Sequence, residues 1–278
     1  MIKLSVYIVT KNEEQRLPLV LESVKVLADE IVVVDSGSTD RTEEISKQYG
    51  ARFIFHQFQS IGHQVRYAEQ CCKYRWVLRL DADEELSPEL IQEILRVKHV
   101  PQHDGYKIRI ADMYPGYQKG IRWAKHYKNI RLYNRDKMEM CGLLGQDRVE
   151  FKEKNIKVKT LHHLVNHYSY LSLKDSIEKY NRETELQVIR ALHENKNYSP
   201  WRMVGASTLS FLKYYILGRH FLYGFWGFIN CVNIGFLRFL KFSKYYEYRQ
   251  KQKYIYPPVI PGTRQEQGAD TDKSSVTN

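Results

Sequence analysis

The first hundred residues alternate between short apolar runs and stretches in which apolar residues recur at helical spacing. Four apolar, β-branched runs are typical of buried strands and occupy residues 2–9, 31–34, 52–56 and 76–80. Helical spacing, or a capping serine followed by proline, predicts helices over residues 18–27, 39–50, 63–73 and from Ser87 onward. This alternation predicts an α/β fold built on a mostly parallel sheet with flanking helices.

Beyond residue 105 the alternation weakens. Two further strands are expected at Tyr106–Ile110 and Ile130–Tyr133, as a mixed extension of the sheet. A helix is expected from Leu171 to about His193, and long aromatic helices within residues 201–250.

The chain is expected to divide into three parts. The α/β domain would occupy residues 1–200, and an aromatic, basic helical region would occupy residues 201–256. The remaining residues, 257–278, are polar and almost free of apolar side chains from Gly262 onward, so we expect a disordered tail.

Polar clusters follow three of the predicted strands: Thr10–Glu13, Asp35–Asp40 and Asp81–Glu85. In open parallel sheets, ligands bind beyond the carboxyl ends of the strands. The three clusters therefore predict one binding site at that edge.

The cluster at 81–85 carries the strongest chemical signal. Asp81 and Asp83 are two residues apart after an apolar strand, a spacing that points both carboxylates to the same side. Such a pair can hold a hard divalent cation, which in turn can neutralise a diphosphate. The alternative is an acidic turn that opens the helix at Ser87, and Glu84 and Glu85 are expected to start that helix.

The second cluster, VVVDSGSTDRT at residues 32–42, suits a nucleoside. Asp35 can accept the N3–H of a pyrimidine, while Ser36 and Gly37 let the backbone approach a base or ribose. The alternative for Ser38–Asp40 is that they cap the next helix. No Lys-Ser/Thr follows the glycine, so this is not a P-loop.

Composition adds the class of protein. With 278 residues, 43% hydrophobic and 27% charged, the chain can bury a sizeable core. The four cysteines form no CxxC pair, so a zinc site or disulfide framework is not expected and a reducing compartment fits. The N-terminal apolar run turns charged at Lys11, unlike a signal peptide or membrane span. We expect a cytoplasmic globular enzyme.

The net charge of +11 is concentrated near the C-terminus. Residues 201–256 hold nine Lys/Arg, one acid (Glu247) and 17 of the 36 aromatic residues. An anionic membrane surface suits this combination. The 17 uncharged residues 221–237 are too diluted by Gly and Asn for a comfortable membrane span, so a surface-lying element is expected. Packing on the catalytic domain or between copies in a homo-oligomer is the alternative, and nucleic acid is not expected as a partner.

The motifs SVYIVTKNEE, VVVDSGSTDRTEEI and VLRLDADEELSPEL, in this order, resemble family 2 glycosyltransferases of the GT-A fold. The resemblance is strongest to the bacterial lipopolysaccharide-core β-glucosyltransferase subgroup. It continues through IRLYNR at 130–135, NHYSYLSLKDSIEKYNRET at 166–184 and the aromatic C-terminal segment.

The resemblance implies an inverting transfer from a UDP-sugar, dependent on Mg²⁺ or Mn²⁺, to a hydroxyl of a glycolipid or lipid-linked saccharide. Carried over by position, Thr10, Glu13 and Asp35 would line the nucleoside pocket. Asp81 would face the ribose or the metal, and Asp83 would hold the metal against the diphosphate. The enzyme would then lie at the cytoplasmic face of the cell membrane.

Two positions depart from the subgroup's pattern. Where the subgroup carries a His-Glu pair, this chain has Gln146-Asp147, which makes Asp147 the implied general base although its side chain is one methylene shorter. The alternative is a loop aspartate paired with Arg148 or Arg131. The subgroup's Gln-basic-Asn stretch appears as Gln64-Val65-Arg66, so Arg66 would supply the positive charge at the nucleotide one position later.

His167 is the candidate histidine ligand of the metal, because GT-A enzymes often carry a histidine after the base region. The alternative is a packed, hydrogen-bonded histidine among aromatic residues. Its spacing from His163 would suit zinc only on a helix, and the surrounding residues favour a strand.

Two other functions stay open. A polyprenyl-phosphate sugar synthase would use a lipid phosphate as acceptor and would need no general base. A catalytically inactive relative would bind nucleotide as an assembly subunit without turnover.

Overall fold

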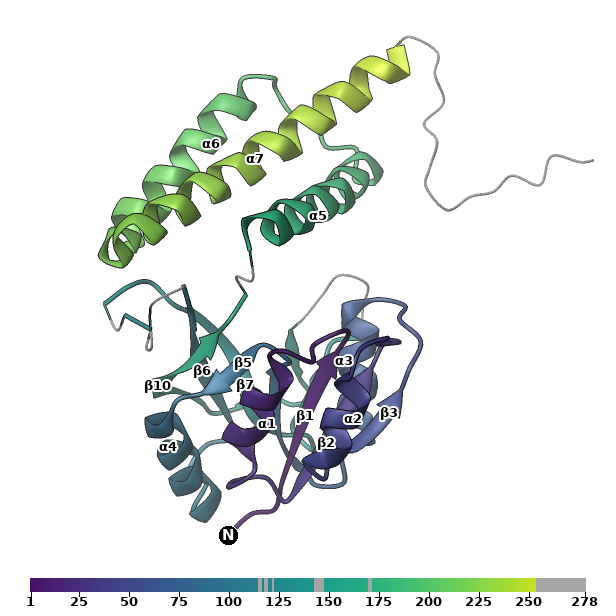
Figure 1. Ribbon diagram of the computed structural model, residues 1–278, viewed down its shortest axis with the longest axis vertical. Coiled ribbons are helices and arrows are strands. Elements are labelled where there is room, and N and C mark those ends of the chain that lie inside the picture. Colours follow the sequence, from purple (N-terminus) through teal and green to yellow (C-terminus); the bar gives the residue numbers. More distant parts are fainter. Residues whose placement is uncertain (115–116, 118–119, 122, 143–147, 170–171, 254–278) are drawn as a thin grey trace, which may run out of the picture. The chain divides into compact units, whose positions relative to one another are not determined.

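The computed structural model describes residues 1–114, 117, 120–121, 123–142, 148–169 and 172–253 (Figure 1). Its centre is an eight-stranded sheet with the order β3-β2-β1-β4-β7-β6-β10-β5. The strands are β1 (Leu4–Thr10), β2 (Glu30–Asp35), β3 (Arg52–Phe55), β4 (Trp76–Asp81), β5 (Glu84–Leu86), β6 (Gly105–Asp112), β7 (Tyr127–Asn134) and β10 (Val158–His167). Six of them run in one direction, whereas β7 and β5 run antiparallel to their neighbours. The predicted mostly parallel α/β sheet with a mixed extension is confirmed.

Alternate side chains of each strand enter two separate cores. In β1, Val6 and Ile8 pack with helices on one face of the sheet, and Tyr7 belongs to the core on the other face. Because neighbouring residues of a strand point to opposite faces, a continuous apolar run is what a sheet covered on both sides requires.

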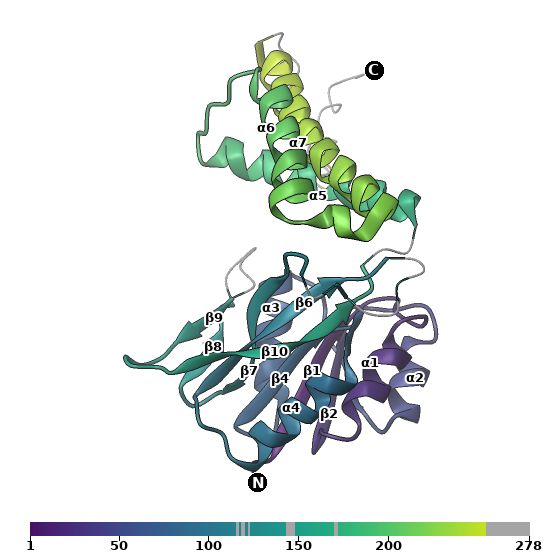
Figure 2. The same cartoon turned by 90° about the vertical axis from the view of Figure 1, so that its left-hand side faces the viewer.

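Four helices cover these faces (Figure 2). The face that carries the larger core is covered by α1 (Leu17–Val24), α2 (Thr42–Gln48) and α4 (Pro88–His99), and the other by α3 (Ile61–Cys71). Beside α3 lies a two-stranded ribbon of β8 (Met138–Met140) and β9 (Val149–Phe151). The Ser87 cap is confirmed, since its hydroxyl accepts a hydrogen bond from Leu90 N at 3.2 Å.

The acidic turn after β4 differs from the expectation. Glu84 and Glu85 do not start a helix, because Glu84–Leu86 forms β5, which pairs antiparallel with the end of β10. Leu86 is buried in the larger core, and the helix begins only at Pro88. Burial of this alternating segment thus outweighs the preference of acids for a helix start.

The C-terminal part is helical, as expected. Its elements are α5 (Leu173–His193), α6 (Arg202–Leu212), the π-helix η1 (Lys213–Leu217), the 3₁₀-helix η2 (His220–Tyr223) and α7 (Gly224–Lys253). The chain forms two compact units. The first comprises residues 1–177 and 213–230. The second comprises residues 178–212 and resumes at residue 231. The boundary expected at residue 200 falls inside the second unit, and the expected tail at 257–278 lies outside the described residues.

Candidate active site

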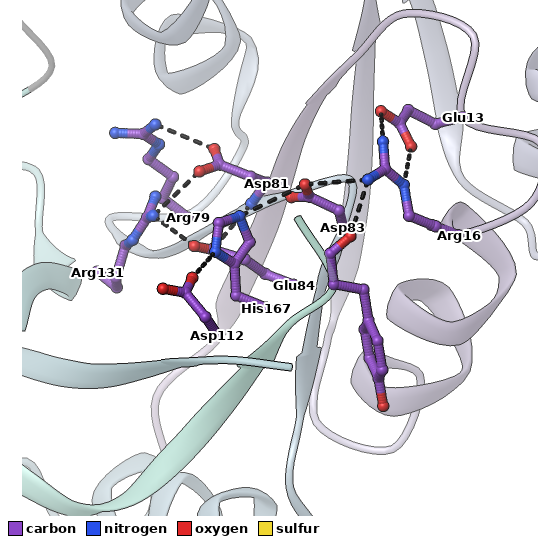
Figure 3. Close-up of polar contacts among 10 residues, drawn as sticks. Glu13, Arg16, Arg79, Asp81, Asp83, Glu84, Asp112, Arg131 and His167 are labelled. Atoms are coloured by element: carbon purple, nitrogen blue, oxygen red, sulfur yellow. Dashed lines mark hydrogen bonds and ion pairs between the residues drawn. The ribbon is translucent and has the colours of Figure 1, made fainter. Parts of the chain in front are cut away.

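One edge of the sheet gathers the carboxyl ends of the parallel strands. β1 ends at Thr10, β2 at Asp35, β4 at Asp81, β6 at Asp112 and β10 at His167. These strands share one direction, so their last residues meet at the same edge. Figure 3 shows the polar side chains that converge there.

His167 lies between two aspartates at this edge. Its Nδ1 is 2.9 Å from Asp112 Oδ1, and its Nε2 is 3.4 Å from Asp83 Oδ2 (Figure 3). The strand register explains the grouping: His167 pairs with Asp112 across β6–β10 and with Glu84, next to Asp83, across β10–β5. Burial lowers the pKa of His167, but the hydrogen bonds and charges of the two aspartates outweigh it and raise the pKa to about 10.

Asp81 meets different partners although it is only two residues from Asp83. Its Oδ1 accepts a hydrogen bond from Arg79 at 3.0 Å, and its Oδ2 accepts one from Arg131 at 3.1 Å. The same Nη2 of Arg131 donates to Glu84 Oε1 at 2.7 Å, and this pair is almost completely buried. Burial would raise the pKa of Asp81, but the two guanidinium groups hold it far below its usual range.

The donors around His167 fit a divalent metal shared with a substrate once the protonated ring gives up its Nε2 proton, because only neutral imidazole binds a metal. Because Asp112 accepts from Nδ1, Nε2 is the ring nitrogen that faces Asp83, the arrangement in which a carboxylate orients a metal-binding histidine. Within the described ranges no three His, Cys, Asp or Glu side chains form a complete metal site. Asp83 and His167 would therefore supply two ligands, and diphosphate oxygens would supply others, as is usual for Mg²⁺.

The loops after β1 and β2 are joined to each other. Asn12, with a φ of 54°, donates its backbone N–H to Ser38 Oγ at 2.7 Å and accepts from Thr39 N at 2.8 Å. Glu13 N donates to Thr42 Oγ1 at 2.9 Å. Two of the polar clusters singled out in the sequence thus form one surface at the edge of the sheet.

Asp35 shapes the second of these loops. Its carboxylate accepts hydrogen bonds from Gly37 N and Ser38 N, both at 2.7 Å, and from the Ser38 hydroxyl. Gly37 has a φ of +97°, which favours glycine, so the turn depends on this residue. Asp35 is 2% exposed, and its role toward a pyrimidine stays a prediction.

Thr10 and Ser36 lie side by side where the two strands end. Ser36 N donates to Thr10 O at 3.1 Å. The Thr10 hydroxyl is buried and has no hydrogen-bond partner in the described part of the chain. Such an orphaned group next to a binding edge is available to a ligand or a water.

Arg16 connects the loop after β1 with Asp83. Its guanidinium makes two hydrogen bonds to the Glu13 carboxylate, at 2.5 and 2.7 Å, and one to Tyr168 O at 2.8 Å. It also lies 3.5 Å from Asp83 Oδ2. Glu13 and Arg16 line a hollow of about 210 Å³ together with Asn12, Glu14, Gln15 and Asp40.

Arg66 lies on α3 and is bound to the β8–β9 ribbon. Its guanidinium donates to Glu139 at 2.7 Å and to Met140 O at 2.9 Å. These bonds hold Arg66 against the end of β8, and a Cβ added at Gly142 would contact the Arg66 side chain. A role of Arg66 at the nucleotide stays a prediction.

Asp147 lies outside the described residues. The two arginines named as its alternative partners have other partners: Arg148 Nη2 is 3.1 Å from Glu150, and Arg131 binds Asp81 and Glu84.

Four residues of the site were not found from the sequence: Arg16, Arg79, Asp112 and Arg131. Asp112 ends a strand, as Asp81 does, and could have been found by that signal. The partners of Arg16 and Arg131 depend on the strand register and on loop geometry, for which the sequence carries no local signal.

Comparisons with known proteins identify the family of this chain. The family model described as "Glycosyl transferase family 2" matches residues 5–176. An uncharacterized glycosyltransferase of Rickettsia typhi is 35% identical over 81% of this chain and 80% of its own length. The lipopolysaccharide core biosynthesis glycosyltransferase LpsC of Rhizobium meliloti is 27% identical over 76% of this chain and 80% of its own. Among solved structures, S. aureus TarS 1–349 matches 94% of this chain and 95% of its own at 16% identity, with a TM-score of 0.43.

Proposed function

Because this chain belongs to glycosyl transferase family 2, we propose that it moves a sugar from a UDP-sugar to a hydroxyl of a glycolipid or lipid-linked saccharide, with inversion at the anomeric carbon. The observation that carries the proposal is the pairing of Asp83 with His167 at the edge of the sheet, beside the loops of Thr10 and Asp35. A pair of side chains that can ligate a metal, next to a polar surface, is what a nucleoside diphosphate requires.

The donor would lie across the strand ends. Thr10, Glu13, Asp35 and Ser36 would face the nucleoside. The Thr10 hydroxyl, which has no partner among the described residues, would offer a hydrogen bond there. Asp81 would face the ribose. The two arginines that donate hydrogen bonds to its carboxylate keep it ionised and fixed in place.

Asp83 and His167 would hold Mg²⁺ or Mn²⁺. When bound, such a cation neutralises the charge that develops on the departing diphosphate. Asp112 would orient the His167 ring, and Arg16 would fix Asp83 relative to the Glu13 loop.

Asp147 would act as the general base. It would take the proton of the acceptor hydroxyl while that oxygen forms a bond to the anomeric carbon, on the face opposite the breaking bond to the diphosphate. One displacement of this kind inverts the configuration and releases UDP.

The acceptor class is supported by the relative LpsC, whose name refers to lipopolysaccharide core biosynthesis. The four cysteines are free, which suits a reducing compartment. We place the enzyme at the inner face of the cell membrane, where residues 201–256 would contact anionic lipid. Among the described residues, no helix is both long enough and apolar enough to cross a bilayer.

The test begins with a panel of UDP-sugars, each with Mn²⁺ or Mg²⁺, in which UDP release identifies the donor. The Asp147→Asn variant should then keep donor affinity and lose about 10²–10⁴-fold in turnover on the true acceptor, the range for a lost general base. Asp136→Asn, an exposed aspartate paired with Arg75, is the matched control. If Asp147→Asn retains most of its rate, the base lies elsewhere, or the acceptor is a lipid phosphate that needs no base.

A further inference from the structure

Residues 213–230 form a helical turn that packs on the α/β unit. We call this segment the tip; it comprises η1, η2 and the first residues of α7. Gly218 O accepts a hydrogen bond from Lys125 N at 2.9 Å, and the Tyr223 hydroxyl accepts one from Ile121 N at 3.0 Å. The Tyr223 ring also packs edge-on against Tyr114, with ring centroids 5.1 Å apart.

The tip is anchored next to the candidate active site. Tyr114 follows two residues after Asp112, the aspartate that binds His167. The buried cluster of Tyr114, Ala124 and Tyr223 therefore fixes the tip relative to the end of β6. Whatever the tip binds is held near the edge of the sheet where transfer would occur.

Apolar side chains of the tip project into solvent. Leu217 is 77% exposed and Phe225 is 76% exposed, so most of each side chain is in contact with water. The other exposed apolar residues of the tip are Ile216, Phe221, Leu222 and Phe228. A monomeric protein seldom leaves so many large apolar side chains together in water, so this surface marks an interaction site.

The charged residues around the tip indicate which kind of surface it binds. Lys213 and Arg219 are exposed beside the apolar residues, and no Asp or Glu occurs between Trp201 and Tyr246. Tyr214, Tyr215 and Trp226 add amphipathic rings of the kind that lie at the level of lipid headgroups. Exposed apolar side chains with a basic rim match an anionic bilayer. A second copy of the tip would have to pair acidic residues with the basic rim, and the tip has none.

We propose that the tip inserts into the surface of an anionic lipid bilayer and so holds the α/β unit with its active-site edge near membrane-anchored acceptors. This use of the tip rests on the proposed transfer to a lipid-linked saccharide, but insertion itself does not depend on catalysis. The tip lies in the bilayer interface and does not span it, in keeping with its short helical elements.

The experiment is co-sedimentation of the full chain with vesicles of phosphatidylglycerol and phosphatidylcholine, compared with phosphatidylcholine alone. The unaltered protein should bind the anionic vesicles, and binding should weaken at high salt without vanishing, because salt screens the charges and not the apolar insertion. The double variant Leu217→Gln/Phe225→Gln should bind about tenfold or more weaker for each lost side chain. Glutamine is neutral, so the loss cannot come from charge.

The matched control is Val26→Gln/Val100→Gln, which removes two exposed apolar side chains elsewhere on the α/β unit. It should bind vesicles as the unaltered protein does, and both double variants should release UDP from the donor in solution at the same rate.

Equal vesicle binding by both double variants, or no binding by the unaltered protein at low salt, would overturn the proposal. A tip variant that turns a dimer into a monomer without a change in vesicle binding would also overturn it and assign the tip to a contact between copies. Vesicle binding by a protein without transferase activity would instead refute the proposed function and leave the tip's role standing.

Discussion

Asp81 and Asp83 differ by two positions in the chain, yet one is bound to two arginines and the other faces a histidine. The carboxylate of Asp81 is therefore held by two guanidinium groups although its side chain is partly exposed, and that of Asp83 is the one that we propose a metal shares with substrate. The spacing of the two residues predicted a joint site, and the structure divides their surroundings.

The pair of Arg131 with Glu84 and Asp81 predicts a stability effect. Replacing Arg131 by Met leaves the buried carboxylate of Glu84 without its cation and Asp81 with Arg79 alone, which should lower the free energy of unfolding by about 3–5 kcal/mol. Urea denaturation measures this change. Adding Glu84→Gln to Arg131→Met should recover part of the loss, because one buried charge is then removed. Arg148→Met, whose arginine makes an exposed pair with Glu150, is the control, and an equal effect of the two Met variants would contradict the account.

Asp112 is predicted to act as a positioning residue for His167. Asp112→Ala removes the partner of Nδ1 and should weaken Mn²⁺ binding in the presence of UDP by about 10–100-fold. Asp112→Asn keeps an oxygen acceptor and should restore part of this affinity. Calorimetric titration with Mn²⁺ measures both. Asp104→Ala, next to the opposite end of the same strand, should have no such effect, and an unchanged Mn²⁺ affinity in Asp112→Ala would remove Asp112 from the site.

At the scale of elements, Asp29 connects the start of β1 with the end of α4. Its carboxylate accepts from Leu4 N at 2.9 Å and lies 2.6 Å from the Lys98 ammonium, which also donates to Leu27 O. Burial would raise the pKa of Asp29, but Lys98, Lys3 and the Leu4 N–H outweigh it and lower the pKa to about 2.

A pH-dependent difference in stability follows. A lowered folded-state pKa means that the stabilisation is complete above the ordinary value of 3.8 and is lost as the pH falls toward 2. Asp29→Asn should therefore cost about 1–2 kcal/mol at pH 7 and much less near pH 2, as measured by denaturation at both pH values. Asp136→Asn should cost almost nothing at either pH, since its ion pair with Arg75 is exposed. A pH-independent loss in Asp29→Asn would show that packing and not charge accounts for it.

The elements of the parallel half were predictable from the sequence, because each buried strand is a continuous apolar run that ends in a polar cluster. β5 was not, since a three-residue strand with two glutamates carries no strand signal of its own and forms only through pairing with β10. The same pairing brings His167 to Asp83 across 84 positions of the chain. The candidate residues were thus predictable one by one, whereas their contacts depend on a register that no local pattern encodes.

For the whole molecule, membership of the family shows the class of reaction. The side chains at the edge of the sheet support our proposal of how that reaction proceeds. That proposal requires the nucleotide and the metal to bind together, because Asp83 and His167 would supply only part of the metal's ligands and the diphosphate would supply others. Metal and UDP should therefore each raise the affinity for the other by the same factor.

Calorimetric titration of UDP in the presence and absence of Mn²⁺ tests this claim most directly, applied to the unaltered chain, Asp83→Asn and Glu85→Gln. Glu85 lies in the same acidic segment but accepts a hydrogen bond from the Tyr168 hydroxyl and does not face His167, which makes it the matched control. The unaltered chain and Glu85→Gln should bind UDP tightly only with Mn²⁺. Asp83→Asn should lose more than about 100-fold of this affinity, because a direct metal ligand contributes more than an orienting residue. UDP affinity that does not change with Mn²⁺ would contradict the account. So would an Asp83→Asn variant whose affinities for UDP and Mn²⁺ equal those of the unaltered chain.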